Sequence, residues 1–324
     1  MKLNINFLNR LFLVPVLLVA CLFLFQTSLH AQDSKAAVEE PTAPTKAKPV
    51  KNTFESVWII DNQTVMVPMK GTFEMDIMHR FGTVEKGYDD FLGFFAPSNI
   101  RLGVNYAPVK NLFVGIGITK DQMLWDGNAK YAILRQTPGK YPVSVTYYGN
   151  MAFDTRKNVE NGLFKFNSQR ISSFNQIIIA RKITEAFSLQ VAPSISHQNA
   201  VNGFYTKNDS TGKTIFKEME FDQFSVAVSG RYKLTEGTTF MINYDQPLTK
   251  HATKNPSPNL SFGLGFNTSN HAFQLFMGNY FMLNQQRNNL YNQNSPFGYT
   301  AADGTKVKGG DFLIGFNITR LWNY

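Results

Sequence analysis

The sequence predicts an all-β fold, a transmembrane antiparallel up-and-down β-barrel of about 12 strands. The first observation is the final stretch, 310–324, where Phe312, Ile314, Phe316 and Ile318 share one face, and the other face is polar or small except for Leu313. A soluble domain seldom ends on such an apolar strand, because a terminal strand is usually an open edge. A barrel removes that edge by pairing its last strand with its first.

The second observation is that alternating segments of this kind recur along the chain from residue 71 onward. Each is about ten residues long, enough for a tilted strand to cross the hydrocarbon core of a membrane. The fourth segment has the weakest pattern. The predicted strands are 71–82, 98–107, 112–120, 128–135, 141–152, 171–181, 186–197, 222–233, 238–245, 259–267, 272–283 and 310–324.

The third observation is that the connections alternate in length. Turns such as 108–111 join strands 2–3, 4–5, 6–7, 8–9 and 10–11, whereas long polar loops such as 198–221 join the other consecutive pairs. Short turns on one rim and long loops on the other are typical of outer-membrane barrels, whereas a β-sandwich mixes its loop lengths. We therefore predict a location in the outer membrane of a Gram-negative cell, with outer-membrane lipid around the barrel and the C-terminal strand recognised by the barrel-assembly machinery.

Composition agrees with this fold class. Apolar residues make up 43% of the chain and charged residues only 17%, but just one run, 11–25, approaches the length of a membrane-spanning helix. A barrel hides its lipid-facing side chains by alternation, so its average hydropathy resembles that of a soluble protein. A soluble periplasmic binding module of lipocalin-like shape remains an alternative.

The N-terminal 31 residues have the pattern of a secretory signal peptide. Lys2 and Arg10 form a basic region, 11–25 an apolar one, and Ala31 offers a small residue at the cleavage point. An uncleaved anchor helix and a lipoprotein processed at Cys21 are less favoured alternatives. Because Cys21 is the single cysteine, cleavage leaves no thiol for disulfides, thiolate metal sites or attached haem. We predict no cofactor.

Two segments separate the signal from the barrel. Residues 32–53 are rich in Ala, Pro, Lys, Thr and Glu, a composition that cannot bury a core and predicts a disordered periplasmic arm able to reach a periplasmic partner. Residues 54–70 contain two short apolar runs, 57–60 and 64–67. They predict a short strand or a plug-like segment at the periplasmic mouth of the barrel, which itself spans 71–324.

Charged side chains within the strands are predicted to face the lumen. A charge on the lipid face costs about 2–4 kcal/mol at the midplane, so the phase of each strand assigns its charges to the interior. Two interpretations stay open: a salt-bridge network that plugs the barrel, or a polar constriction that selects a small solute. The predicted lumen residues are Glu74, Asp76, Arg80, Arg101, Arg231 and Asp245.

Aromatic residues on the apolar faces predict where the membrane ends. Tyr106, Tyr232 and Trp322 all lie near the short-turn rim. Amphipathic rings are enriched at membrane–water interfaces, so these three are candidates for an aromatic girdle. Scattered core aromatics are the alternative interpretation.

Nothing in the sequence predicts nucleic-acid binding or catalysis. The net charge of +9 is spread along the chain without a block of like charges, and no sequence motif of a metalloprotease, serine hydrolase or phosphate-binding loop occurs. Asp89, Asp90, His197 and His251 can approach the long-loop rim, which keeps an outer-membrane enzyme as an alternative. Chance placement is favoured, with the two aspartates in a solvated loop or in a divalent-cation bridge to lipopolysaccharide.

One stretch also suggests a family. The segment 66–72 leads into His79-Arg80-Phe81-Gly82, and together with the aromatic C-terminus it resembles a Bacteroidetes outer-membrane β-barrel family of uncharacterised function. The resemblance covers about residues 54–324. It implies the fold and the location and supplies no catalytic residues. The expected role is passage of a small solute, or a structural or partner-binding role.

Overall fold

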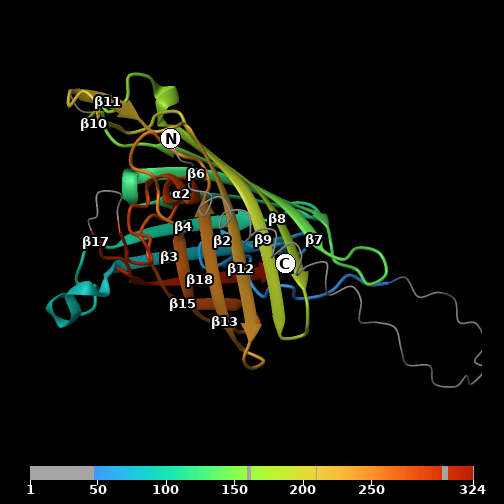
Figure 1. Ribbon diagram of the computed structural model, residues 1–324. Coiled ribbons are helices and arrows are strands. Elements are labelled where there is room, and N and C mark those ends of the chain that lie inside the picture. Colours follow the sequence, from blue (N-terminus) through green and yellow to red (C-terminus); the bar gives the residue numbers. More distant parts are fainter. Residues whose placement is uncertain (1–46, 159–161, 209, 301–305, 324) are drawn as a thin grey trace, which may run out of the picture. The chain divides into compact units, whose positions relative to one another are not determined.

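The computed structural model describes residues 47–158, 162–208, 210–300 and 306–323. The predicted signal peptide and most of the predicted arm lie outside these residues. Twelve antiparallel strands form a closed barrel (Figure 1), in the order β12-β13-β14-β15-β18-β3-β4-β5-β6-β7-β8-β9. These strands are β3 (Thr72–Thr83), β4 (Asn99–Tyr106), β5 (Leu112–Thr119), β6 (Leu124–Leu134), β7 (Ser144–Asp154), β8 (Ile171–Lys182), β9 (Phe187–Gln198), β12 (Asp222–Lys233), β13 (Thr238–Pro247), β14 (Asn259–Asn267), β15 (His271–Gly278) and β18 (Leu313–Asn323).

Closure joins the two ends of the barrel sequence. The last strand, β18, pairs antiparallel with the first, β3, from Leu313 opposite Thr83 to Asn323 opposite Thr72. Every strand of the barrel therefore has two neighbours, and no row of backbone donors and acceptors is left open to lipid. The predicted fold class is confirmed.

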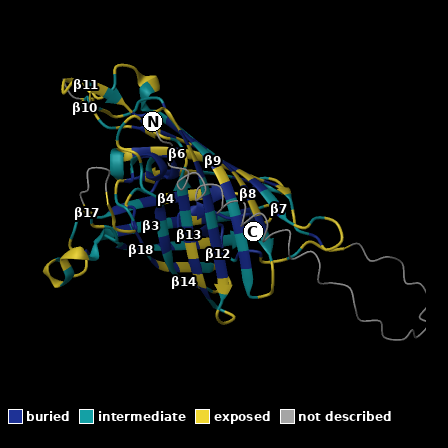
Figure 2. Ribbon diagram, viewed as in Figure 1, coloured by how far each residue is buried: buried dark blue, intermediate teal, exposed yellow. Residues whose placement is uncertain are grey.

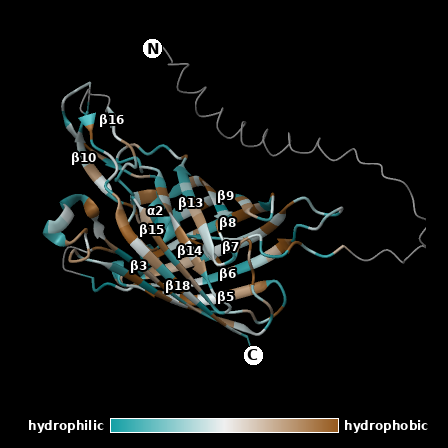
Figure 3. Cartoon of the chain, turned by 90° about the horizontal axis from the view of Figure 1, so that it is seen from below, coloured by the Kyte–Doolittle hydropathy of each residue, from teal (hydrophilic) through white to brown (hydrophobic). Residues whose placement is uncertain are grey.

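Residues along the barrel strands alternate between buried and more exposed (Figure 2). In β14, Leu264 and Phe266 are exposed, whereas Asn259 and Ser261 are fully buried. Hydropathy alternates with the same period (Figure 3). Apolar side chains thus point outward and polar ones inward, the reverse of a soluble barrel. The lipocalin-like alternative is therefore wrong.

Two consecutive connections differ in length from the prediction: the predicted long loop is short, and the predicted tight turn is longer. The predicted long loop between the third and fourth strands is only 120–123, because β6 begins at Leu124 rather than at residue 128. Gln122 and Met123 adopt positive φ angles of 61° and 49° and reverse the chain within this short loop. The predicted tight turn that follows is the longer connection, 135–143, since β7 begins at Ser144.

The remaining long loops carry short elements of their own. A small hairpin projects from the β9–β12 loop (Figure 1), and the β15–β18 loop contains a buried helix. Among the described residues no helix is both long and apolar enough to cross a membrane. The loop elements are η1 (Val84–Asp90), η2 (Asp121–Met123), η3 (Asn167–Arg170), β10 (Gly203–Lys207), β11 (Thr214–Glu218), α2 (Gln285–Tyr291), β16 (Tyr299–Thr300) and β17 (Lys306–Val307).

Candidate functional site: the occupied lumen

The lumen is occupied by the chain's own N-terminal segment. Residues 54–67, here called the plug segment, contain two short strands, β1 (Trp58–Ile59) and β2 (Asn62–Gln63), which pair with each other as a separate two-stranded sheet. Ile60 turns the chain between them with a φ of 61° and is 0% exposed. The structure thus places the segment inside the barrel, deeper than the predicted position at its mouth.

Side chains of the barrel wall hold the backbone of the plug segment. Gln274 of β15 donates to the carbonyl of Trp58 at 2.8 Å and accepts from the amide of Ile60 at 3.0 Å. Buried backbone groups require partners, and here side chains supply them in place of a strand ladder. Further donors to plug-segment carbonyls are Lys130 to Val57, Gln190 to Gln63, Thr146 to Val65 and Asn317 to Ile60.

Apolar packing adds to these hydrogen bonds. On one side of the plug segment Ile59 and Ile60 pack against inward-facing wall residues, and on the other side Val57 and Trp58 do the same. Inward positions of a membrane barrel are ordinarily polar, so these apolar positions mark where the plug segment seats. The wall residues are Tyr148, Phe174, Ile178, Ala180, Ala192, Ala227, Met241 and Phe276 in the first cluster, and Met78, Ala107, Phe113 and Ala132 in the second.

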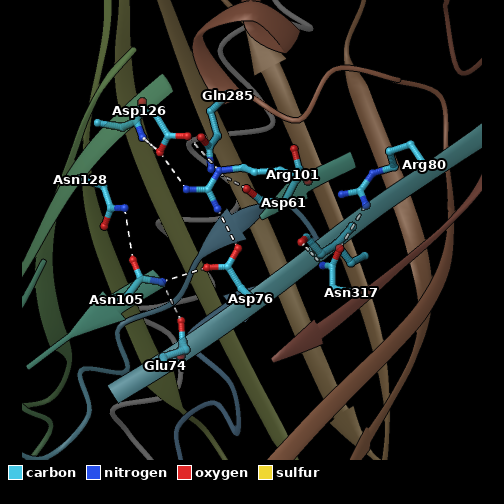
Figure 4. Close-up of polar contacts among 12 residues, drawn as sticks. Asp61, Glu74, Asp76, Arg80, Arg101, Asn105, Asp126, Asn128, Gln285 and Asn317 are labelled. Carbon is cyan, nitrogen blue, oxygen red and sulfur yellow. Dashed lines mark hydrogen bonds and ion pairs between the residues drawn. The ribbon is translucent and has the colours of Figure 1, made fainter. Parts of the chain in front are cut away.

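A charged cluster lies on the wall beside the plug segment (Figure 4). Arg101 of β4 contacts Asp76 of β3 at 2.7 Å and Asp126 of β6 at 2.7 Å. The three side chains are 4%, 1% and 2% exposed. Asn105 extends the cluster by donating to Asp76 at 2.8 Å and to Glu74 at 3.2 Å. Desolvated ions of this kind are tolerated because each is paired and hydrogen-bonded.

Inward-facing glycines make room for this cluster. A Cβ on Gly117 of β5 would lie 2.6 Å from Cζ of Arg101 and 2.8 Å from Oδ2 of Asp126. Neither neighbour can retreat easily, because each is bonded to the other. The absence of a side chain at this position therefore lets the guanidinium lie flat against the wall.

We expect Gly117→Ala to lower the free energy of unfolding by about 1–3 kcal/mol, the usual cost of overpacking. The matched control is Gly127→Ala on the adjacent strand, where an added Cβ meets nothing within 4 Å. Urea unfolding of both variants in detergent micelles measures the difference. Equal stabilities for the two variants would contradict the close packing around Arg101.

A second polar group surrounds the tip of the plug segment. Asn62 donates to Asp245 at 2.9 Å and to Asn243 at 3.0 Å, both on β13. Asp61 accepts a hydrogen bond from the hydroxyl of Tyr280. The tip is thereby fixed by side chains of β13 and of the segment that follows β15.

The helix α2 closes the lumen from the long-loop side. Gln286 donates to Asn150 of β7 at 3.0 Å, and Gln285 donates to the carbonyl of Asp61 in the plug segment at 2.7 Å. Two small cavities of about 10 and 20 Å³ border Trp58. Each has room for no more than about one water molecule. Plug segment and helix therefore meet and fill the lumen.

All six sequence-predicted lumen residues are buried, but they do not form one network. Arg101 and Asp76 share the cluster above, whereas Arg231 pairs with Glu55 of the plug segment and Asp245 binds Asn62. Arg80 instead donates to Asn317 at 3.0 Å and lies 4.4 Å from the ring of Phe276. Glu74 bonds to Asn105. The sequence analysis missed Asp61, Asp126 and Lys130.

The three aromatic residues predicted for a girdle lie on the outer surface near the short-turn rim. Tyr106 and Tyr232 are 45% and 51% exposed, and the ring of Trp322 lies 5.5 Å from that of Phe73. The strand register pairs Tyr232 with Phe240 and Phe187, and it pairs both Tyr106 and Trp322 with Phe73.

The rim histidines have structural partners. His197 contacts Asp222 through Nδ1 at 2.7 Å and Asn199 through Nε2 at 2.9 Å. His251, in the β13–β14 loop, accepts from the amide of Glu220 at 2.9 Å and contacts Gln223 at 2.7 Å. Burial lowers the pKa of His251, against the opposing charge of Glu220, which fits a neutral ring with one donor and one acceptor.

The two rim aspartates named in the sequence analysis, Asp89 and Asp90, lie at the end of η1 in the β3–β4 loop. Asp90 accepts a hydrogen bond from the amide of Gly93 at 2.9 Å within the exposed β3–β4 loop, next to Asp89. Among the described residues no group of three or more His, Cys, Asp or Glu side chains is arranged to hold a metal ion.

Comparison with known protein families decides the identity of the chain. The model of the family described as membrane-bound beta barrel domain (DUF5777) matches residues 54–322. The chain belongs to this family. The match begins at the first residue of the plug segment, so the plug segment lies within the DUF5777 domain. Together with the closed barrel, membership identifies this DUF5777 protein as an outer-membrane β-barrel.

Solved outer-membrane barrels resemble the DUF5777 protein in fold. They include the NanC porin (10% identity, TM-score 0.40, covering 78% of this chain and 99% of that one) and an outer-membrane channel from Pseudomonas putida F1 (10%, 0.45, 79% and 97%). The Pseudomonas putida toluene transporter TodX is similar at 7% identity and a TM-score of 0.34, covering 80% and 91%. Comparison with curated proteins gave no match.

Proposed function

We propose that this barrel passes a small polar solute across the outer membrane and that the plug segment gates the passage. The observation that carries the proposal is how the plug segment is held. Its strands β1 and β2 pair only with each other among the described elements, and the wall binds them through side chains such as Gln274 and Asn317. The segment can leave without breaking any strand pairing of the barrel.

On withdrawal of the plug segment, water replaces its hydrogen bonds to the barrel wall. Each such bond contributes only about 0.5–1.5 kcal/mol net, whereas β3 and β18 keep their full ladder. The emptied lumen would be lined mainly by amides and hydroxyls, which suit a hydrated polar solute. Such inward residues include Thr146, Gln176, Gln190, Ser194, Ser229, Asn243, Ser261, Gln274 and Asn317.

The plug segment enters the lumen from the short-turn rim. Just before it, the amide of Val50 donates to the carbonyl of Gln136 in the β6–β7 connection at 2.8 Å, and Glu55 pairs with Arg231 near the end of β12. In outer-membrane barrels the short turns face the periplasm. A periplasmic partner bound to residues 32–53 would therefore pull directly on the plug segment, which gives that arm a role in opening.

Conductance across planar lipid bilayers tests the proposal. The variant has residues 54–67 replaced by a Gly/Ser stretch of equal length, which keeps the arm and the barrel strands intact. We expect the wild type to remain mostly closed and the variant to show sustained open currents. Heat-modifiable migration on gels serves as the folding control. A folded variant as silent as the wild type would contradict gating by the plug segment.

A further inference from the structure

We infer that a small carboxylate binds at the long-loop mouth of the barrel, in a cavity walled by α2 and the β7–β8 loop. This inference deepens the proposed function, since it names the class of solute, but it can fail independently. The cavity, here called the vestibule, has a volume of about 240 Å³. Its charged lining residues are three arginines, Arg156, Arg170 and Arg287, and one aspartate, Asp154.

Arg287 has only a distant counterion. Its side chain is 18% exposed, and its Nε lies 4.0 Å from a carboxylate oxygen of Asp121, too far for a hydrogen bond. Among the described residues its guanidinium makes no hydrogen bond, and Nε is fully buried without a partner. The ring of Tyr291 lies 5.1 Å away and packs against one side. A desolvated guanidinium without an acceptor is costly, and an anion in the vestibule supplies the acceptor.

The other two arginines are held in place by the loop. Asp154 binds Arg156 through both carboxylate oxygens, at 3.0 Å to Nε and 2.7 Å to Nη2. Arg170 donates through Nη1 to the carbonyls of Asp154 and Arg156, each at 2.8 Å. Both carboxylate oxygens of Asp154 are used by Arg156. The other two arginines, Arg170 and Arg287, therefore retain hydrogen-bond donors and positive charge toward the vestibule. A guanidinium fork matches a carboxylate with two parallel hydrogen bonds.

The rest of the lining defines the body of the ligand. Leu163, Phe164, Val201 and Tyr291 give the vestibule an apolar side, and the volume lies below the roughly 300–1,000 Å³ of pockets for drug-sized ligands. These features fit a small carboxylate with an apolar or ring-shaped body better than a bare inorganic anion. The same helix α2 that lines the vestibule with Arg287 and Tyr291 also contacts the plug segment through Gln285.

Calorimetric titration of the folded full-length protein in detergent tests the inference, with benzoate as the probe. We expect benzoate to bind, uncharged benzamide not to bind, and Arg287→Gln to weaken benzoate binding by about tenfold or more, as loss of a charged hydrogen bond requires. Arg135→Gln, in the exposed β6–β7 connection, is the matched control and should leave binding unchanged.

Several outcomes would overturn the carboxylate site. These are absence of benzoate binding, equal binding by folded Arg287→Gln, equal binding of benzamide, or equal binding of inorganic phosphate at the same ionic strength. Heat-modifiable migration checks that each variant is folded. The titration needs neither a membrane nor an open lumen. Benzoate binding to a protein that never conducts would therefore contradict the proposed passage of a solute but not the carboxylate site.

Discussion

Replacing Arg101 with methionine is expected to lower the free energy of unfolding by about 3–5 kcal/mol. The substitution leaves Asp76 and Asp126 buried without a cation, and both are almost fully inaccessible to water. Asn105 and Asn150 still donate to these carboxylates, at 2.8 and 2.9 Å. Without the guanidinium, neutral amide donors cannot balance the two buried negative charges. The substitution therefore destabilises the barrel wall itself.

A charge-neutral variant separates lost pairing from lost packing. Arg101→Met combined with Asp76→Asn and Asp126→Asn removes all three charges while leaving carbonyl oxygens for the existing amide donors, and we expect it to recover most of the stability. Arg135→Met, at an exposed arginine, is the control for the substitution itself. Urea unfolding in detergent gives the free energy of unfolding of the single Arg101 variant, the triple variant and the Arg135 control. A single Arg101 variant as stable as the Arg135 control would refute the structural role of the cluster.

Trp58→Ala is expected to release the plug segment without unfolding the barrel. Trp58 is buried among plug and wall residues, including Val67, Met78 and Phe113. Removal of a buried tryptophan side chain costs about 3–5 kcal/mol. That loss falls on the docked state of the plug segment, so the equilibrium between docked and withdrawn plug shifts by roughly 100-fold or more.

Single-channel recording measures this shift as the fraction of time spent open. Met69→Ala is the control, because Met69 follows the plug segment and is 69% exposed. We expect Trp58→Ala to open far more often than wild type, with unchanged heat-modifiable migration, and Met69→Ala to behave like wild type. Loss of the folded band in Trp58→Ala would mean that the plug segment is part of the barrel's core and not a gate.

The strands of the barrel were predictable because lipid on one side and a polar lumen on the other impose strict alternation. The predicted bounds 222–233 and 259–267 match β12 and β14 in the structure. The start of β6 was missed because Gly127 interrupts the outward apolar face and Asp126, on the inner face, is a residue type that is also common in loops. Asp126 was therefore absent from the predicted lumen charges, although it is the partner that completes the Arg101 cluster.

The extent of the plug and the role of α2 were not predictable from alternation. The strand pattern assigns Met78 and Phe276 to the inner face. Inward positions of a water-filled lumen are expected to be polar. These two apolar residues were therefore the available signal for a segment docked inside the barrel. The helix α2 comes from the segment 284–293, so rich in Asn and Gln that it has the composition of a solvated loop. The helix folds inward because amides and hydroxyls of the barrel wall form hydrogen bonds with its polar side chains. These partners are distant in the sequence and are brought together only by the tertiary structure.

The central claim, that the plug segment occupies the lumen, is tested most directly by the reactivity of a single cysteine. In a Cys21→Ser background, which has no other cysteine, Ile60→Cys and Met69→Cys are each exposed to a water-soluble maleimide in folded proteoliposomes. The buried position 60 is expected to react at least about 100-fold more slowly than position 69, and both are expected to react rapidly after heat denaturation. Equal rates in the folded protein would show that the segment lies outside the lumen.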